Sequence, residues 1–345
     1  MSNFSIERSK MASQCEQMFE QLTTLKPNTW PVLYSSEYNI TFCGMEKLHP
    51  MDSSKWGNTF AFLQAGGMLS PENVVTPPEI SREQLIEFHT ERYINSLRWS
   101  ANVARITEVP PVACVPNFLV QRNLLRRLRL QTSGTILAAK LALDHGWSIN
   151  LGGGFHHCSS DAGGGFCAYA DISGALKTLH RAELISKALI IDLDAHQGNG
   201  HERDFLDCDW VHTLDVYNHR IYPFDQKALK MKNLMAVQLH PYTEDGPYLK
   251  KVSESLDRIL AKCGDSKPNI IAYNAGTDCL MEDPLGALNV SPQGIMQRDE
   301  LVFRKAKELN IPIFMVLSGG YLTEAAKVVA DSILNLREKG LISAI

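Results

Sequence analysis

The chain has 345 residues, of which 44% are hydrophobic and 21% charged, and a formal net charge of −4. This composition is typical of a globular protein, and the acidic balance excludes the overall basic surface of many nucleic-acid-binding proteins. Because no apolar run has the length of a membrane helix and the start lacks a signal-peptide pattern, we expect no membrane span and a nuclear or cytoplasmic location. Eight scattered cysteines without a CxxC spacing indicate reduced thiols.

Residues 1–28 are polar and lack a clear apolar run, so we expect a flexible N-terminal extension. Residues 29–345 contain no linker, repeat or low-complexity stretch and are predicted to form one domain. Upstream, SREQLIEFH (81–89) opens with the spacing of a capping box, which predicts a helix start.

The latter half of the chain alternates short apolar runs with longer amphipathic segments. The runs are rich in Ile, Val and Leu and lack polar alternation in their middles, which is typical of strands buried on both faces. They lie at 147–154, 187–196, 210–217, 269–278 and 311–321.

Two segments between these runs have helical patterns, 248–264 and 291–310, the second opening with the N-cap pair Ser291–Pro292. The alternation predicts an α/β fold. We expect a single three-layer domain with a central, mostly parallel sheet and helices on both faces.

Each apolar run ends in polar or glycine residues: GGGFHH, DLDAHQGNG, DVYNH, NAGTD and SGGY. Open parallel sheets bind ligands just outside the carboxyl ends of their strands. The five segments are therefore predicted to meet at one edge of the sheet.

The run ending in DLDAH places Asp192, Asp194 and His196 on the same side of an extended strand. Carboxylates held this close need a positive partner, which a divalent metal supplies. The alternative, a capping Asp with a solvated His, is less favoured because the preceding run is too apolar for unpaired carboxylates.

Asp278, at the end of NAGTD, is by itself typical of a turn or helix cap. Together with Asp194 and His196 it completes an Asp, His, Asp set. Three protein ligands and an open position are typical of catalytic zinc, although iron, cobalt and manganese remain alternatives. Two roles are open for Tyr321 in SGGY. It packs at the strand edge, or, beside a metal, its hydroxyl donates a hydrogen bond to a developing oxyanion.

The motifs GGGFHHC, GGGFCAYAD, DLDAHQGNGHE, NAGTD and SGGY resemble, in order and spacing, those of the zinc-dependent histone deacetylases, which have the arginase–deacetylase fold. The resemblance covers almost the whole chain after the extension. Segments such as YNITFCGMEKLHP, VPNFLVQRNLLR and ERDFLDCDWVHTLDVYNHRIYP are most similar to the class IV branch, the histone deacetylase eleven type.

The resemblance implies that Asp194, His196 and Asp278 are the zinc ligands. It makes His157 the general base and acid, with His156 a second imidazole beside the attacking water.

The resemblance also implies that Asp192 orients His156 and that Tyr321 binds the substrate carbonyl. Asn199 stands where class I enzymes carry an Asp facing the second histidine, and an amide cannot hold a proton on His157 as a carboxylate would.

Two further groups of residues follow from the resemblance. Gly165, Phe166 and Tyr222 are implied to line the acyl-lysine tunnel. A structural potassium ion is implied near Asp192, Asp194, His196, Thr213 and Leu214.

The implied activity is hydrolysis of N6-acyl-lysine in proteins such as histones. Class IV membership implies long fatty acyl groups as candidate substrates beside acetyl. Corepressor proteins are candidate partners, and no direct binding of nucleic acid is expected.

The sequence bears on several alternative functions. An arginase-like enzyme needs a second metal, but Gly198 and Leu280 occupy the positions of its ligands, which argues for one metal and for an amidohydrolase instead of a ureohydrolase. An acetylpolyamine amidohydrolase would use the same catalytic set, and a non-catalytic scaffold would not be expected to keep it whole. Phe224 stands in YPFD where close relatives have YPGD, so its bulk at the rim puts substrate preference in question.

Two other features have ordinary explanations. The basic run RNLLRRLRL (122–130) is predicted to be a solvated or ion-paired helix face rather than a nuclear signal or DNA contact. Cys158, beside the histidines, is expected to pack rather than to act as a nucleophile.

Overall fold

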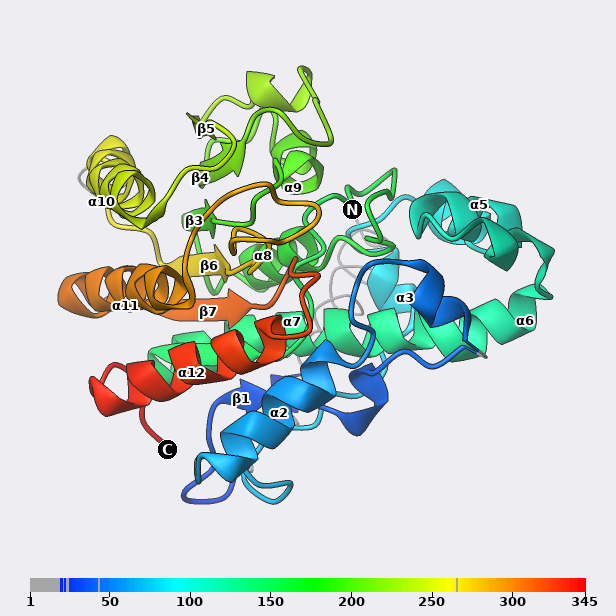
Figure 1. Ribbon diagram of the computed structural model, residues 1–345, viewed down its shortest axis with the longest axis horizontal. Coiled ribbons are helices and arrows are strands. Elements are labelled where there is room, and N and C mark those ends of the chain that lie inside the picture. The colour runs from blue at the N-terminus through cyan, green and yellow to red at the C-terminus, as the bar shows by residue number, and fades with distance from the viewer. Residues whose placement is uncertain (1–18, 21, 23–24, 43, 265) are drawn as a thin grey trace, which may run out of the picture.

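The computed structural model describes residues 19–20, 22, 25–42, 44–264 and 266–345. These residues contain a seven-stranded sheet in the order β1-β2-β7-β6-β3-β4-β5, with parallel pairing throughout (Figure 1). The strands are β1 (Val32–Leu33), β2 (Trp147–Asn150), β3 (Ala188–Asp192), β4 (Val211–Asn218), β5 (Leu234–Leu239), β6 (Ile270–Asn274) and β7 (Ile313–Val316).

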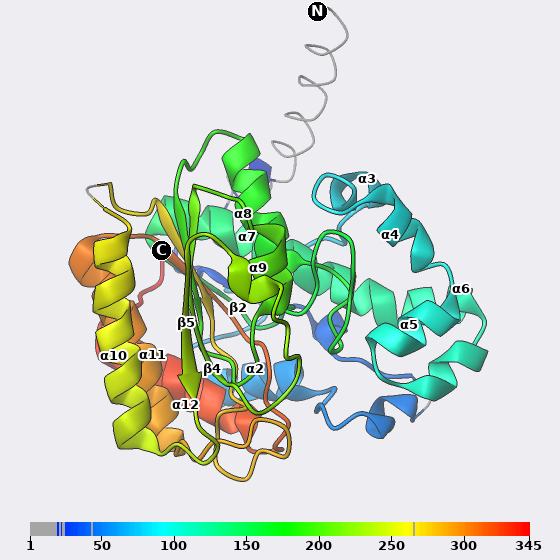
Figure 2. The same ribbon diagram turned by 90° about the horizontal axis from the view of Figure 1, so that it is seen from above.

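Helices cover both faces of the sheet (Figure 2). The helices α7 (Arg126–His145) and α8 (Asp171–Arg181) pack on one face, and α10 (Asp245–Lys262), α11 (Pro292–Leu309) and α12 (Ala325–Glu338) on the other. The other α-helices are α2 (Lys55–Ala65), α3 (Arg82–Leu85), α4 (Glu91–Ser96), α5 (Ser100–Ile106), α6 (Asn117–Val120) and α9 (Asn199–Asp204). The predicted single-domain, three-layer α/β fold is confirmed.

The central strands are apolar on both sides because each side meets a different core. On β3, Ala188 and Ile190 pack with α7 and α8, whereas Leu189 and Ile191 pack with α10 and α11. This double burial is the reason why the predicted runs lack polar alternation, and all five contain a central strand.

The sequence analysis missed the two edge strands, β1 and β5. The strand β5 leaves Ala236 and Gln238 exposed, so it lacks the continuous apolar run of a central strand. The segment 81–89 does begin with a capping box, although its helix is limited to Arg82–Leu85. At the start of α11, Ser291 Oγ accepts the N–H of Gly294 at 3.0 Å, as the predicted N-cap requires.

Most of the predicted extension, residues 1–18, 21, 23 and 24, lies outside the described residues. Phe19 and Leu22, within its bounds, are buried in the core at 8% and 6% exposure. The boundary at residue 28 stays a prediction. In the described part of the chain, no helix combines the length and apolarity needed to cross a membrane.

Candidate active site

The strand order places the site at the middle of the sheet. The neighbouring strands β2, β7, β6 and β3 are followed by loops that carry His156 and His157, Tyr321, Asp278, and Asp194 with His196. All of these loops leave the carboxyl ends of parallel strands, where ligands bind in open α/β sheets. The predicted meeting of these segments at one edge is confirmed.

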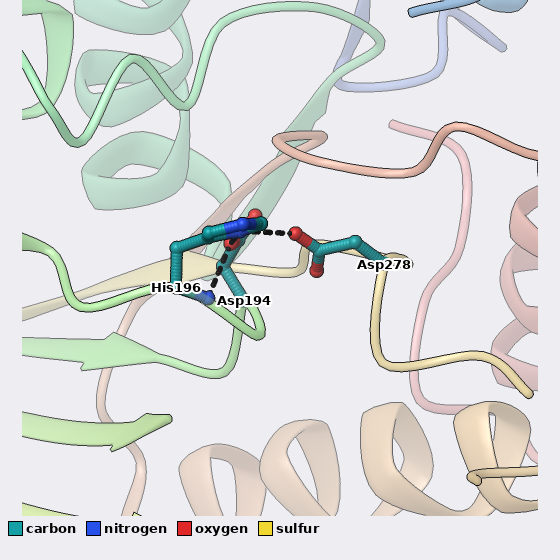
Figure 3. A group of neighbouring side chains, drawn as sticks. All are labelled: Asp194, His196 and Asp278. Atoms are coloured by element: carbon teal, nitrogen blue, oxygen red, sulfur yellow. Dashed lines mark hydrogen bonds and ion pairs between the residues drawn. The ribbon is translucent and has the colours of Figure 1, made fainter. Parts of the chain in front are cut away.

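Asp194, His196 and Asp278 form a compact, buried cluster (Figure 3). The Nδ1 atom of His196 is 3.1 Å from Asp194 Oδ1 and 2.8 Å from Asp278 Oδ2. Backbone groups hold the other carboxylate oxygens: the N–H of Gly319 donates to Asp194 Oδ2, and the N–H of Ala195 donates to Asp278 Oδ1, both at 2.8 Å. One nitrogen and two oxygens are thus directed toward a common point.

Only glycine fits at position 319. A Cβ atom there would lie 2.4 Å from Asp278 Oδ2 and 2.6 Å from Asp194 Oδ2, closer than any real contact of that kind. The SGGY sequence therefore lets the backbone approach both carboxylates and donate a hydrogen bond to one of them.

The cluster has the chemistry of a metal site. Burial and the charge of Asp194 raise the pKa of Asp278 to about 7, because two buried carboxylates this close repel each other. A divalent cation would relieve that repulsion, and an imidazole with two carboxylates suits zinc as well as iron, cobalt or manganese. It is the one such His, Cys, Asp and Glu group within the described residues.

In the metal-free protein, the contribution of Asp278 to stability is expected to fall as pH rises from about 4 to about 7. In this window the Asp278 carboxyl, with an ordinary pKa of 3.8 raised to about 7, keeps a proton that the unfolded chain has lost. This group alone lowers the free energy of unfolding by at most about 4 kcal/mol, whereas the neutral, buried His157 acts in the opposite direction. Urea unfolding of the wild type and Asp278→Asn with a chelator isolates the effect: the stability of the wild type relative to the variant should fall over the window, and a constant difference would contradict it.

The two adjacent histidines have opposite electrostatic environments. Their ring centroids are 4.1 Å apart. Although burial alone would lower the pKa of His156, the charges of Asp194 and Asp192 raise it to about 9, and His156 Nδ1 donates to Asp192 Oδ2 at 2.9 Å. His156 is therefore held as a cation.

His157 is held neutral. Burial and the positive charges of His156 and His196 hold the pKa of His157 well below its ordinary value of 6.5. Its Nδ1 atom is 2.8 Å from Asn199 Oδ1, so the predicted pairing of His157 with Asn199 is present in the structure.

Tyr321 lies beside the cluster, with its ring 6.4 Å from the ring of His196. Its backbone N–H donates to Asp283 Oδ2 at 2.9 Å, which fixes the loop. Burial, followed by the charges of Asp278 and Asp194, raises the pKa of Tyr321 well above 10, so its hydroxyl stays protonated.

Two of the three predicted tunnel residues, Tyr222 and Gly165, contact His157, and the third, Phe166, contacts His49. Tyr222 contacts His157 edge-on with ring centroids 4.9 Å apart, and Phe166 lies 4.7 Å from the ring of His49. Gly165 approaches His157 so closely that a Cβ atom would lie 2.4 Å from its ring. His49, which sequence reasoning missed, also lies 6.3 Å from the ring of Tyr321.

Phe224 departs from glycine at a position where glycine is favoured. Its φ angle is +57°, in the left-handed region, and its side chain is 63% exposed. A non-glycine residue in this conformation costs about 1–2 kcal/mol. The Phe224 side chain, two residues after Tyr222, is thus exposed to solvent and has no burial to offset that cost.

Three positioning residues were missed by the sequence analysis. The Asp171 carboxylate accepts the N–H groups of Gly154 and Phe155, both at 2.8 Å, and so shapes the histidine loop. Lys55, only 1% exposed, donates to the carbonyl oxygens of Ser318 and Gly319. The third, Asp225, contacts Asn199.

These three partnerships are tertiary contacts between distant parts of the chain. Of the three residues, only Asp171 had a local signal in the sequence, because an acidic residue is typical of the first turn of a helix.

The basic run is an ion-paired helix face, as predicted. Arg126 pairs with Glu37 and Glu79, Arg127 with Glu37, and Arg129 with Glu79. Cys158 is buried, and burial raises the pKa of its thiol well above 9, which is unsuited to a nucleophile.

Comparison with known proteins identifies relatives over most of the chain. A family model of the histone deacetylase domain matches residues 49–337. Histone deacetylase 2 of Arabidopsis thaliana is 52% identical over 311 residues, which cover 90% of this chain and 79% of that protein. The acetoin utilization protein AcuC of Staphylococcus aureus is 26% identical over 288 residues, which cover 79% and 72% of the two chains.

Two solved structures share the fold. The HD domain of HDA15 has a TM-score of 0.71 at 18% identity and covers 92% of this chain and 90% of its own. A histone deacetylase homologue complexed with SAHA also has a TM-score of 0.71, at 22% identity, and covers 90% and 84%. With the family model matching most of its length and a close plant relative, the chain belongs to the histone deacetylase family and is an enzyme of the deacetylase type.

Proposed function

We propose that this enzyme hydrolyses N6-acyl-lysine side chains in proteins such as histones, with one zinc ion held by Asp194, His196 and Asp278. The observation that carries the proposal is the pair of histidines beside this cluster: their rings are 4.1 Å apart, and the Nδ1 atom of His156 faces a carboxylate, Asp192, whereas that of His157 faces an amide, Asn199. Amide hydrolysis needs both a neutral base and fixed positive charge near the developing oxyanion.

When bound, the zinc ion would polarise the substrate carbonyl and acidify the attacking water. His157 accepts the proton as the water oxygen bonds to the acyl carbon, and it returns a proton to the lysine amine as the carbon–nitrogen bond breaks. The protonated hydroxyl of Tyr321 donates to the carbonyl oxygen as negative charge develops there. His156, fixed by Asp192, supplies positive charge beside the reaction.

Around these groups, Gly165, Phe166 and Tyr222 would line the passage for the lysine side chain. Their position next to His157 and His49 supports this role.

A potassium ion held by oxygens of Asp192, Asp194, His196, Thr213 and Leu214 is part of the proposal. Thr213 and Leu214 lie on β4 beside β3, which ends at Asp192. The Thr213 hydroxyl is buried and has no hydrogen-bond partner among the described residues. Leaving such a group unpaired costs about 1–3 kcal/mol, which a bound cation would offset.

Following the class IV resemblance, we propose long-chain fatty acyl groups as substrates beside acetyl. An apolar cavity of about 20 Å³ adjoins Phe166 and His49, which is room for about one water-sized group. An alkyl chain would have to widen this cavity. Its other lining residues include Ile40, Phe42, Met45, Met51, Val109, Val112 and Leu124.

We place this activity in the nucleus or the cytoplasm, with corepressor proteins as candidate partners. The name of the Arabidopsis relative, histone deacetylase 2, supports a chromatin substrate.

Matched acetyl-lysine and myristoyl-lysine peptides test the proposal. Metal-free protein is expected to be inactive, zinc is expected to restore turnover, and Tyr321→Phe is expected to lower kcat by about 10²–10³-fold, as loss of an oxyanion donor does. The faster peptide identifies the preferred acyl length.

If the zinc-loaded protein turns over neither peptide, the proposal is wrong. Turnover of an acetylpolyamine would then support the polyamine alternative, and no turnover of any of these substrates would support a scaffold.

A further inference from the structure

The loop after β4 reaches back to the catalytic histidine through a carboxylate that the mechanism has not used. Asn199 Nδ2 donates to Asp225 Oδ2 at 3.2 Å, and on its other side Asn199 Oδ1 is 2.8 Å from His157 Nδ1. Asp225 is therefore one amide away from the imidazole proposed as the base.

The hydrogen-bonding capacity of each group fixes the direction of this chain. An ionised carboxylate only accepts, so the side of Asn199 that faces Asp225 must be its NH₂ group. The amide oxygen then faces His157, and because that oxygen also only accepts, the proton must lie on His157 Nδ1. The lone pair is left on Nε2, the atom that has to accept a proton in catalysis.

Asp225 is itself held rigidly and in its charged form. Arg203 donates to both carboxylate oxygens, and the N–H groups of Lys227 and Ala228 each donate to Oδ1 at 3.1 Å. Burial would raise the pKa of Asp225, but the hydrogen bonds from Arg203, the Ala228 N–H and Asn199 outweigh it, and the pKa lies below 3.8. The side chain is 8% exposed.

We propose that Asp225 is a positioning residue that holds the Asn199 amide in one of its two orientations and thereby fixes the tautomer of His157. The inference rests on the proposed role of His157 as base. The two orientations of an amide have nearly the same shape, so packing alone selects weakly between them. Without the carboxylate, Asn199 can turn its NH₂ group toward Nδ1, which favours the tautomer with the proton on Nε2.

An exchange of the two side chains tests this inference. Asp225→Asn keeps the shape of the side chain but replaces a carboxylate, which only accepts hydrogen bonds, with an amide. We expect kcat to fall about 10- to 100-fold, as it does when other partners that orient an imidazole are lost. Asn199→Asp alone places two carboxylates face to face and is also expected to lower kcat. KM should change little in either variant.

The double variant Asn199→Asp/Asp225→Asn restores the order of donors and acceptors. An aspartate at 199 accepts from His157 whichever way it turns, and the amide at 225 can donate to it. We expect kcat to return to within about threefold of wild type, a large coupling between neighbouring sites. If Asp225 were needed only for its ion pair with Arg203, the double variant would stay as impaired as Asp225→Asn.

A second readout does not depend on turnover. In ¹⁵N-histidine-labelled protein, NMR distinguishes the protonated from the unprotonated ring nitrogen of His157, with and without zinc. We expect protonated Nδ1 in the wild type and the double variant, and a mixture of tautomers in Asp225→Asn. An unchanged tautomer in Asp225→Asn, or no recovery of kcat in the double variant, would overturn the inference. An inactive wild type with the expected tautomers would instead count against the proposed function.

Discussion

Replacing Asp278 with asparagine is expected to abolish stoichiometric zinc binding and to lower kcat/KM by more than about a thousandfold. An asparagine matches the shape of Asp278 but removes the negative charge directed at His196 Nδ1. A bound metal contributes several kcal/mol to stabilisation of the transition state, and about 4 kcal/mol corresponds to a thousandfold in rate. Elemental analysis of zinc after dialysis, together with peptide turnover, measures both effects.

Asp331→Asn provides the matched control, since Asp331 lies on α12 and pairs with Lys327 at the surface. It is expected to keep both zinc and activity. An Asp278→Asn protein that retained one zinc ion per chain would show that the proposed ligand set is wrong.

Replacing Lys55 with methionine is expected to lower the free energy of unfolding by about 3–5 kcal/mol, the usual cost of breaking a buried ionic contact. The side chains have similar volume, but methionine leaves the carbonyl oxygens of Ser318 and Gly319 without their donor. It also removes a positive charge that faces Asp278 and Asp194.

Turnover is expected to fall as well, because the same loop supplies Tyr321 and the Gly319 N–H that holds Asp194. Lys55→Arg keeps the charge and N–H donors and should lose less stability and activity. Urea unfolding and peptide turnover measure the two effects. Equal stability of Lys55→Met and wild type would mean that Lys55 does not hold this loop.

The sequence predicted those parts of the fold in which burial on both sides leaves a continuous run of apolar residues. The strands β3 and β6 are apolar on both sides, whereas the edge strand β5 is exposed along one side and resembles a loop in its composition. The helix α11 was predicted because its N-cap, Ser291, forms a local contact that its own sequence encodes.

The residues of the site fall into the same two groups, those that the sequence predicted and those that it did not. Asp194, His196 and Asp278 follow buried strands, so the strand pattern places them at one edge of the sheet, and the pairing of β3 with β6 brings them together. Lys55 and Asp225 instead act on groups far away in the sequence, a backbone carbonyl oxygen and a side-chain amide. Neither a motif nor a periodicity indicates such a partner, because the contact exists only once α2 and the loop after β4 are in place.

The arrangement of the strands also has a consequence for the order of folding. Asp194 and Asp278 follow β3 and β6, which pair in parallel although β4, β5 and α10 separate them in the chain. Parallel pairs with long crossovers form slowly, because a long loop must close before the contacts form. Uptake of the proposed zinc ion should therefore follow assembly of the sheet, and bound metal would stabilise only those chains in which β3 and β6 have found the correct register.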